Sequence, residues 1–260
     1  MKKCTLAFVI LAFCGAANAA TPAESAPAPI ALVAIKPGSQ PYISICSAFK
    51  DTCKGSAAIW KAKNSDDSFY LILPGTRLME VQREGDTLTK VAMWDFSGYK
   101  TEHTPDEDLT QDENYIYPAL YPLSKTKWAV AIVSRWSAGY SGGGRSEEIA
   151  DFMMLNRDGS YQPAFKNVPF SSAAIIRACF TEADYAKSAH CHDESWSVLR
   201  LKITDTAKAF YSWRFITTSY SWPAFKDKKA TEKKTIVRVE YPFQQALHAP
   251  DKASASTQEN

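Results

Sequence analysis

The chain has 260 residues, of which 45% are hydrophobic and 22% are charged, and this ordinary composition excludes a disordered, collagenous or coiled-coil protein. Its formal charge of +2 comes from Lys2 and Lys3, because the rest of the chain carries 28 basic and 28 acidic side chains. A neutral chain has no electrostatic drive toward nucleic acid or an anionic membrane, so we expect neither as a partner. The length is enough for one large domain that needs no structural metal.

Residues 1–19 have the three parts of a secretory signal peptide: two lysines, an apolar run over residues 6–13, and small residues before a cleavage site after Ala19. The run is shorter than the roughly 20 residues of a membrane-spanning helix, and no later run reaches that length, so we expect no membrane span. A lipoprotein signal is the alternative because of Cys14, although bulky Phe13 stands where such signals carry a small residue. The leader therefore predicts an exported protein, with the periplasm as its destination.

The remainder divides into a spacer, one domain and a tail. Residues 20–29 are rich in Ala and Pro, which predicts an extended spacer. Residues 249–260 are polar and without pattern, which predicts a flexible C-terminal tail. Residues 30–248 contain no linker or internal repeat, and we expect them to form a single β-rich domain.

Four cysteines remain after export, and an even number in an oxidising compartment indicates disulfides. Three connectivities are possible, and pairing sequence neighbours would close two short loops. Neither neighbouring pair has the two-residue spacing of a redox motif or a zinc knuckle. The predicted disulfide residues are Cys46, Cys53, Cys179 and Cys191.

Apolar runs separated by turn residues predict most of the domain as strands. The tripeptide Pro74-Gly75-Thr76 predicts a tight turn between two strands, and Glu84-Gly85-Asp86 predicts the next. The run over 128–133 is apolar throughout, which favours a strand buried on both faces. In chain order, the predicted strands cover residues 69–73, 77–82, 88–96, 128–133, 199–203 and 236–241.

Helical signals are few. Thr181 to Asp184 has the pattern of a capping box and predicts a short helix before Cys191, while Ser146-Glu147-Glu148 predicts the start of another. We therefore expect a mainly β fold, an antiparallel sandwich or double sheet with one or two short helices. A β-rich α+β fold is the alternative.

The segment from Gly139 to Gly143 fits the G-x-S-x-G pattern of a hydrolase nucleophile elbow, with Ser141 as the nucleophile. The pattern requires a strand directly before the serine, yet residues 134–138 intervene, and the surroundings predict hairpins. We therefore assign no catalytic residue and keep Ser141 as a minor candidate. Its candidate partners in the sequence are Asp158, Asp184, Asp193, His190, His192 and His248.

The same loop combines the residue types that are enriched at binding hot spots with glycines that allow close backbone approach. The predicted partner-binding residues are Trp136, Tyr140, Gly142, Gly143 and Arg145. This pattern favours a non-catalytic periplasmic binding protein, because the chain is also predicted to be exported, to have a disulfide-bonded β-rich fold and to have no convincing active site. We expect an inhibitor or immunity-type protein that neutralises an envelope-acting enzyme, so its partner would be a protein of the cell envelope.

Aromatic residues suggest a second hypothesis. Tyr211, Trp213 and Phe215 alternate along a predicted strand, with Tyr220 and Trp222 beyond them. Such a strip either forms half of a sandwich core or stacks on sugar rings. The core interpretation is favoured, and a glycan-binding or envelope-structural protein remains the alternative function.

We expect no metal and no cofactor. The run from His190 to Glu194 has metal-ligand residue types, but Cys191 is expected to be oxidised. The acidic stretch over 102–114 spaces its carboxylates as a calcium loop does, but Gln111 stands in place of the essential glycine.

Overall fold

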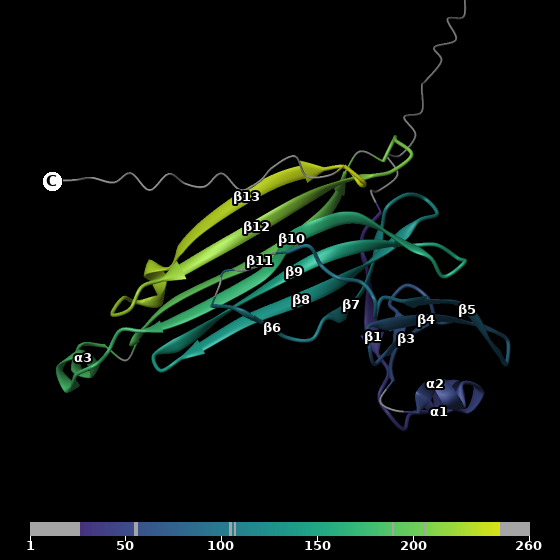
Figure 1. Cartoon of the computed structure of the whole chain (residues 1–260), viewed down its shortest axis with the longest axis horizontal. Coiled ribbons are helices and arrows are strands. Elements are labelled where there is room, and N and C mark those ends of the chain that lie inside the picture. The colour runs from purple at the N-terminus through teal and green to yellow at the C-terminus, as the bar shows by residue number, and fades with distance from the viewer. Residues whose placement is uncertain are drawn as a thin grey trace, which may run out of the picture.

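The computed structural model describes residues 27–54, 57–103, 106, 108–188, 190–204 and 206–244. The expected signal peptide, its cleavage site, residues 20–26 of the spacer and the tail over 249–260 lie outside the described residues. Thirteen antiparallel strands dominate the described chain, which confirms the predicted mainly β fold. The two layers of the expected double sheet are parts of one open, continuously hydrogen-bonded sheet (Figure 1).

Neighbouring strands follow the order β13-β12-β11-β10-β9-β8-β7-β1-β2-β3-β4-β5, and β6 pairs with β8 away from this path. Three short α-helices and one 3₁₀ turn, Lys228–Ala230, complete the described structure. The strands are β1 (Ile30–Ala34), β2 (Ala58–Ala62), β3 (Ser68–Leu73), β4 (Arg77–Glu84), β5 (Thr87–Asp95), β6 (Thr110–Gln111), β7 (Tyr115–Pro122), β8 (Trp128–Tyr140), β9 (Gly143–Leu155), β10 (Tyr161–Arg177), β11 (His192–Thr204), β12 (Ser212–Trp222) and β13 (Glu232–Glu240); the helices are α1 (Gln40–Ala48), α2 (Lys50–Cys53) and α3 (Glu182–Lys187).

Local sequence explains the elements that were predicted. The hairpin between β3 and β4 turns at Gly75 and Thr76, which both have positive φ. Helix α3 begins with the expected capping box, in which the Thr181 and Asp184 side chains each accept a hydrogen bond from the other residue's backbone N–H. The helix expected at Ser146 is wrong, because this segment lies within β9 and pairs with β8 on one side and β10 on the other.

Helix α1 was not predicted from the sequence. It begins after Ser39 with a proline in its first turn, a position that proline favours. Ile45 is its one buried residue, and Tyr42, Cys46 and Phe49 pack beside it at helical spacing, a short apolar stripe that the sequence prediction missed. The disulfide between Cys46 and Cys53 ties α1 to α2, so the connectivity that the sequence left open joins these two neighbours.

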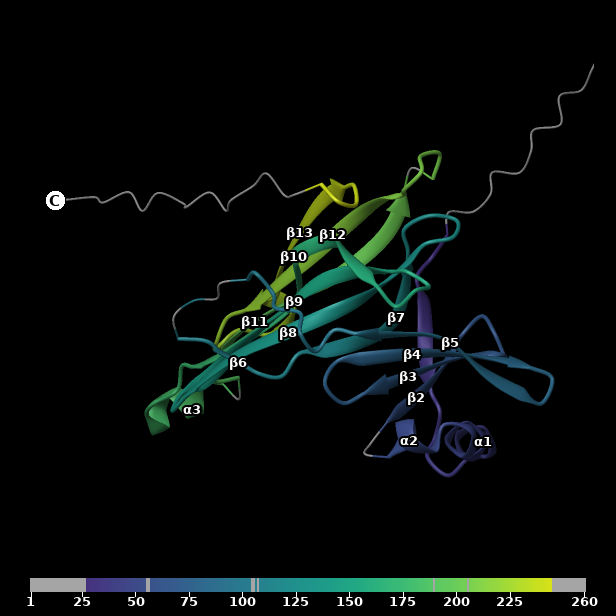
Figure 2. The same cartoon turned by 45° about the vertical axis from the view of Figure 1, so that its right-hand side comes forward.

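Three apolar cores hold the sheet together. The first lies between helix α1 and the sheet β2–β4, around Leu71 and Val81. The second joins the face of β1–β5 that bears Trp94 to the face of β7–β9 that bears Ile132, so these two parts of the sheet pack on one another (Figure 2). The third is aromatic and lies among β7–β12, where Trp213 is fully buried.

The long strands extend beyond these cores. Figure 1 shows β8–β12 running side by side from the end near β1–β5 to helix α3. None of the buried residues of the described chain lies in the outer parts of β8–β13, and we call these parts the distal half. The distal half comprises residues 135–140, 143–148, 171–177, 192–198, 217–222 and 232–237. Within the described chain no second sheet covers it, although Asp106, Asp108 and Leu109 lie against part of it.

Candidate functional site

The predicted elbow is a β-hairpin. Tyr140 pairs with Gly143, so Ser141 and Gly142 form a two-residue turn between β8 and β9. An added Cβ at Gly143 would lie 1.8 Å from the Ile175 carbonyl oxygen on β10, so this position admits only glycine without a shift of the backbone. The glycines thus serve a close approach of strands, and strand-turn-strand replaces the strand-turn-helix of a nucleophile elbow.

Four of the six candidate acid and base residues for Ser141 lie at the far end of β9 or have other partners. Asp158 lies in the turn after Leu155, at the opposite end of β9 from Ser141. Asp184 caps helix α3, and Asp193 accepts a hydrogen bond from the Ala224 backbone at 2.8 Å. His190 stacks on Trp222, with ring centroids 3.5 Å apart, and His248 lies outside the described residues.

Two of the five predicted partner-binding residues hold an acidic segment against the sheet. Arg145 donates to Asp106 at 2.8 Å and to Asp108 at 2.6 Å. Trp136 is half-buried, and its ring meets that of His103 edge-on. His103 in turn lies 3.0 Å from a carboxylate oxygen of Glu147. Arg145 and Trp136 therefore contact residues of this chain. Among the five predicted partner-binding residues, Tyr140 is the one with a large exposed side chain.

A second charged cluster lies where the distal half leaves the core. Glu148 accepts hydrogen bonds from Ser171 at 2.6 Å, Arg135 at 2.7 Å and Tyr115 at 3.1 Å. Burial opposes the charged carboxylate, but these hydrogen bonds and the guanidinium prevail and lower the pKa of Glu148. Because its oxygens are occupied by three strands, we assign Glu148 to positioning β7, β8 and β10 around β9.

Exposed apolar side chains gather at the far end of the distal half. Tyr140 is 45% exposed at the hairpin turn, and Phe180 is 71% exposed just before helix α3. Ile176, Tyr185 and Phe225 are also exposed. We call these five residues the distal tip. Of these five residues, Tyr140 was the one predicted from the sequence as a binding residue. The other four are exposed because no second sheet of the described chain covers this end of the molecule, and no local sequence pattern indicates that.

Arg177 and Lys187 connect the parts of the distal tip. The Arg177 backbone N–H donates to the Gly142 carbonyl of the hairpin, and its guanidinium donates to the Tyr185 hydroxyl at 2.9 Å. The same guanidinium lies 5.4 Å from the centroid of the Phe180 ring, a cation–π contact. Lys187 lies in the same way 5.8 Å from the ring of Phe225. Cations from neighbouring segments thus contact Phe180, Tyr185 and Phe225.

A disulfide fixes the base of the tip. Cys179 and Cys191 are bonded to each other and buried, so both disulfides join cysteines that are neighbours in the sequence. The Ala178 backbone N–H donates to the Cys191 carbonyl beside it. Asp184 accepts backbone N–H bonds from Phe180 and Thr181, and these bonds lower its pKa to about 2. The tip is therefore preorganised although it has no core beneath it.

The aromatic residues divide into core and surface sets. Tyr211, Trp213 and Phe215 are buried together, as the core interpretation predicted. Tyr220 stacks on Trp196 with centroids 5.0 Å apart, and Lys233 lies over its ring. Trp222 stacks on His190, and the Lys228 ammonium lies 5.9 Å from its ring centroid. A sugar stacks on a free ring face, and a neighbouring ring already stacks on Tyr220 and on Trp222.

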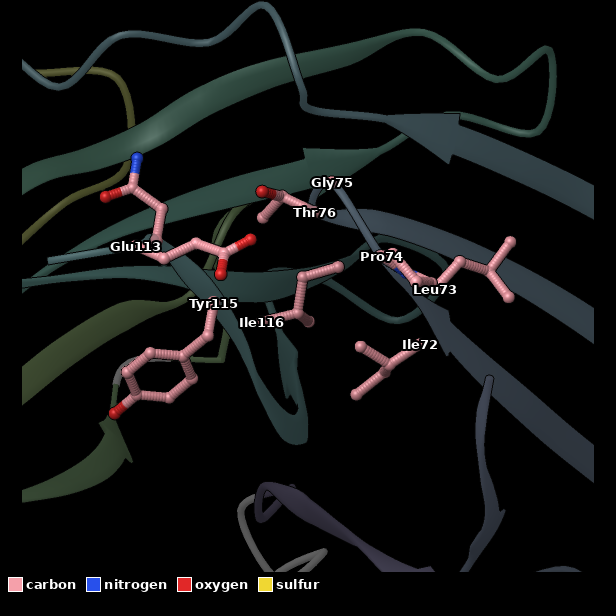
Figure 3. Close-up of a pocket in the computed structure, with 9 residues that line it drawn as sticks. Ile72, Leu73, Pro74, Gly75, Thr76, Glu113, Tyr115 and Ile116 are labelled. Atoms are coloured by element: carbon pink, nitrogen blue, oxygen red, sulfur yellow. The ribbon is translucent and has the colours of Figure 1, made fainter. Parts of the chain in front are cut away.

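A cavity lies between the β3–β4 turn and the start of β7. It has a volume of about 280 Å³ and is lined by residues 72–76 and 113–116 (Figure 3). Its walls are mainly aliphatic and backbone, and Glu113 is their one carboxylate. The Tyr115 hydroxyl donates to Glu148 and so is not available to a ligand there. In the part of the chain that the structure describes, no group of three or more His, Cys, Asp or Glu residues could hold a metal ion.

No family model, curated protein or solved structure matches this chain. Among the described residues, no helix is both long enough and apolar enough to cross a membrane.

Proposed function

We propose that this protein is an exported, non-catalytic binding protein whose distal tip contacts a protein partner in the periplasm. The most specific form of the proposal is an inhibitor or immunity-type protein that neutralises an envelope-acting enzyme. The observation that carries it is the distal tip, a group of exposed aromatic and aliphatic side chains at the end of a single-layered sheet.

The composition and rigidity of the tip support this role. Aromatic and arginine side chains dominate binding hot spots, and the tip presents Tyr140, Phe180 and Tyr185 around Arg177. Binding costs less free energy when these side chains are already ordered, and the Cys179–Cys191 disulfide and the cap of α3 order this segment. Two disulfides also favour an oxidising compartment, consistent with the expected periplasmic location.

The experiment is capture of a partner from envelope extract, followed by an assay of the captured enzyme. Tyr140→Ala with Phe180→Ala is the test variant, and Val33→Ala with Ile43→Ala is the matched control, because both control residues are exposed apolar side chains far from the tip. We expect the wild type and the control to bind one enzyme stoichiometrically and to inhibit it, and the tip variant to lose both effects.

All of these substitutions are at the surface, so each should change the free energy of unfolding by no more than about 0.5 kcal/mol. Equal melting temperatures therefore separate a binding defect from a folding defect. A tip variant that binds and inhibits as well as the wild type would rule out the tip as the contact surface.

The two other hypotheses have their own tests. A fluorophosphonate probe that labels the wild type but not Ser141→Ala would indicate a serine hydrolase instead. A sugar that changes tryptophan fluorescence in the wild type but not in Trp196→Ala would indicate a glycan-binding protein.

A further inference from the structure

Strand β13 forms one edge of the sheet. Within the described part of the chain it pairs with β12 alone. Val237 and Val239 are 54% and 50% exposed on one face, and Ile236 is 49% exposed on the other. A long edge strand with β-branched residues on both faces is a template for pairing with another chain. Among the described residues, no strand pairs with its other edge, which carries exposed apolar side chains.

We propose that β13 pairs antiparallel with β13 of a second copy, about a two-fold axis through Val237. Such an axis is perpendicular to the sheet, so each face stays continuous across the two copies. Val237 then lies opposite its own copy, and Thr235 lies opposite Val239 on the same face. On the other face, Ile236 lies opposite Arg238, and Lys234 lies opposite Glu240.

The charge pattern of β13 is complementary to itself in this register. With the axis at Val237, both Lys234–Glu240 pairs are of opposite sign, and no like charges meet. With the axis at Ile236, Lys234 would lie opposite Arg238, and Glu232 would lie opposite Glu240. Like charges directly opposite one another on paired strands are destabilising.

Four other registers are also less favourable. An axis at Arg238 or at Lys234 would place that cation against its own copy. An axis at Thr235 would pair Glu232 with Arg238, but it would also place Val237 opposite Lys233. An axis at Val239 would also pair a valine with its copy and Arg238 with Glu240, but it would overlap only residues 238–240 of the strand. The axis at Val237 combines opposite charges and a valine pair with an overlap of residues 234–240, and this self-complementarity favours a second copy as the occupant.

The pairing would leave the proposed binding surface free. Glu232 lies beside Ser221, near the distal end of the sheet, whereas Glu240 lies beside the buried Trp213. Antiparallel pairing therefore directs the two distal tips to opposite ends of a continuous sheet. The inference does not depend on the proposed function, because the tip and the β13 edge are separate surfaces.

The test has two parts. Variants that each carry one added cysteine, with both native disulfides intact, are tested for cross-linking, and the wild type is examined by sedimentation velocity. Val237→Cys should oxidise to a covalent dimer, because the two cysteines face each other across the axis. Val239→Cys is the matched control: it has the same face and similar exposure, but its copy would lie about 13 Å away, from the rise per residue along a strand. We expect the wild type to sediment as a dimer and the control to remain uncross-linked.

A charge swap gives an independent readout. Lys234→Glu should weaken the dimer at least tenfold, and adding Glu240→Lys should restore it, because the swapped charges again meet in opposite pairs. A monomer at every concentration, with Val237→Cys no more cross-linked than Val239→Cys, would overturn the proposal. Faster cross-linking through Thr235→Cys than through Val237→Cys would overturn the register.

Discussion

Removal of the Cys179–Cys191 disulfide should loosen the distal tip and abolish partner capture. The bridge closes a loop with a sequence separation of 12 residues, and the loop-closure relation assigns such a loop about 3 kcal/mol of stabilisation. The distal half has no buried core beneath it, so the lost stabilisation should appear as local opening near the tip. The perturbation is the double variant Cys179→Ala with Cys191→Ala.

The Cys46–Cys53 bridge provides the matched control. Its sequence separation of 7 residues corresponds to about 2.5 kcal/mol, nearly the same stabilisation, but it lies between α1 and α2. Hydrogen exchange measured by mass spectrometry should rise across residues 177–188 in the first double variant and across α1 in the second. Only the first should lose partner capture.

One outcome would refute this reasoning. If residues 177–188 keep their protection without the Cys179–Cys191 bridge, while exchange rises uniformly over the cores, then the distal half does not open separately. The tip would in that case be held by the global fold, and the disulfide would not be its local constraint.

Three further predictions concern single residues. Gly143→Ala should cost about 1–3 kcal/mol in thermal unfolding, because its Cβ would overlap a backbone carbonyl, whereas Gly139→Ala, which has open space, should cost less than 1 kcal/mol. Asp151→Asn should cost about 1–3 kcal/mol, measured by urea unfolding, because the buried carboxylate accepts two hydrogen bonds and an amide would turn a donor toward one of them. The lowered pKa of Asp184 means that its stabilising effect is present above the ordinary carboxyl range and is lost as pH falls toward 2, so an NMR titration should place its midpoint near pH 2.

Turn and cap chemistry made the local elements predictable. Gly75 and Thr76 fix the β3–β4 hairpin, and the reciprocal bonds of Thr181 and Asp184 fix the start of α3. A cap signal is weaker when the same residues suit an extended strand. Ser146 follows a glycine turn and precedes two glutamates, as at many helix starts, but the strands on both sides of β9 provide its backbone partners.

The distal half was harder to predict because it lacks the usual strand signal. The sequence predicted a strand that ended at Val133, where the apolar run ends, but β8 continues to Tyr140. Its outer residues are polar or half-exposed since no layer covers them, and hydrogen bonds to β9 hold them extended. Apolar periodicity detects strands through burial, so it cannot detect a strand that is stabilised by pairing alone.

The absence of a second sheet over the distal half also explains how the distal tip is stabilised. Exposed apolar residues on a layered protein would lie over a core that holds them, but the distal tip lies outside the three apolar cores, and its buried neighbours in the chain are Cys179, Cys191 and Ala224. Its order must come from covalent and polar constraints: the Cys179–Cys191 bridge, the cap of α3, and the cations that lie over Phe180 and Phe225. These constraints stabilise a surface that contributes little to folding, as expected where exposed side chains are ordered in advance for contact with a partner.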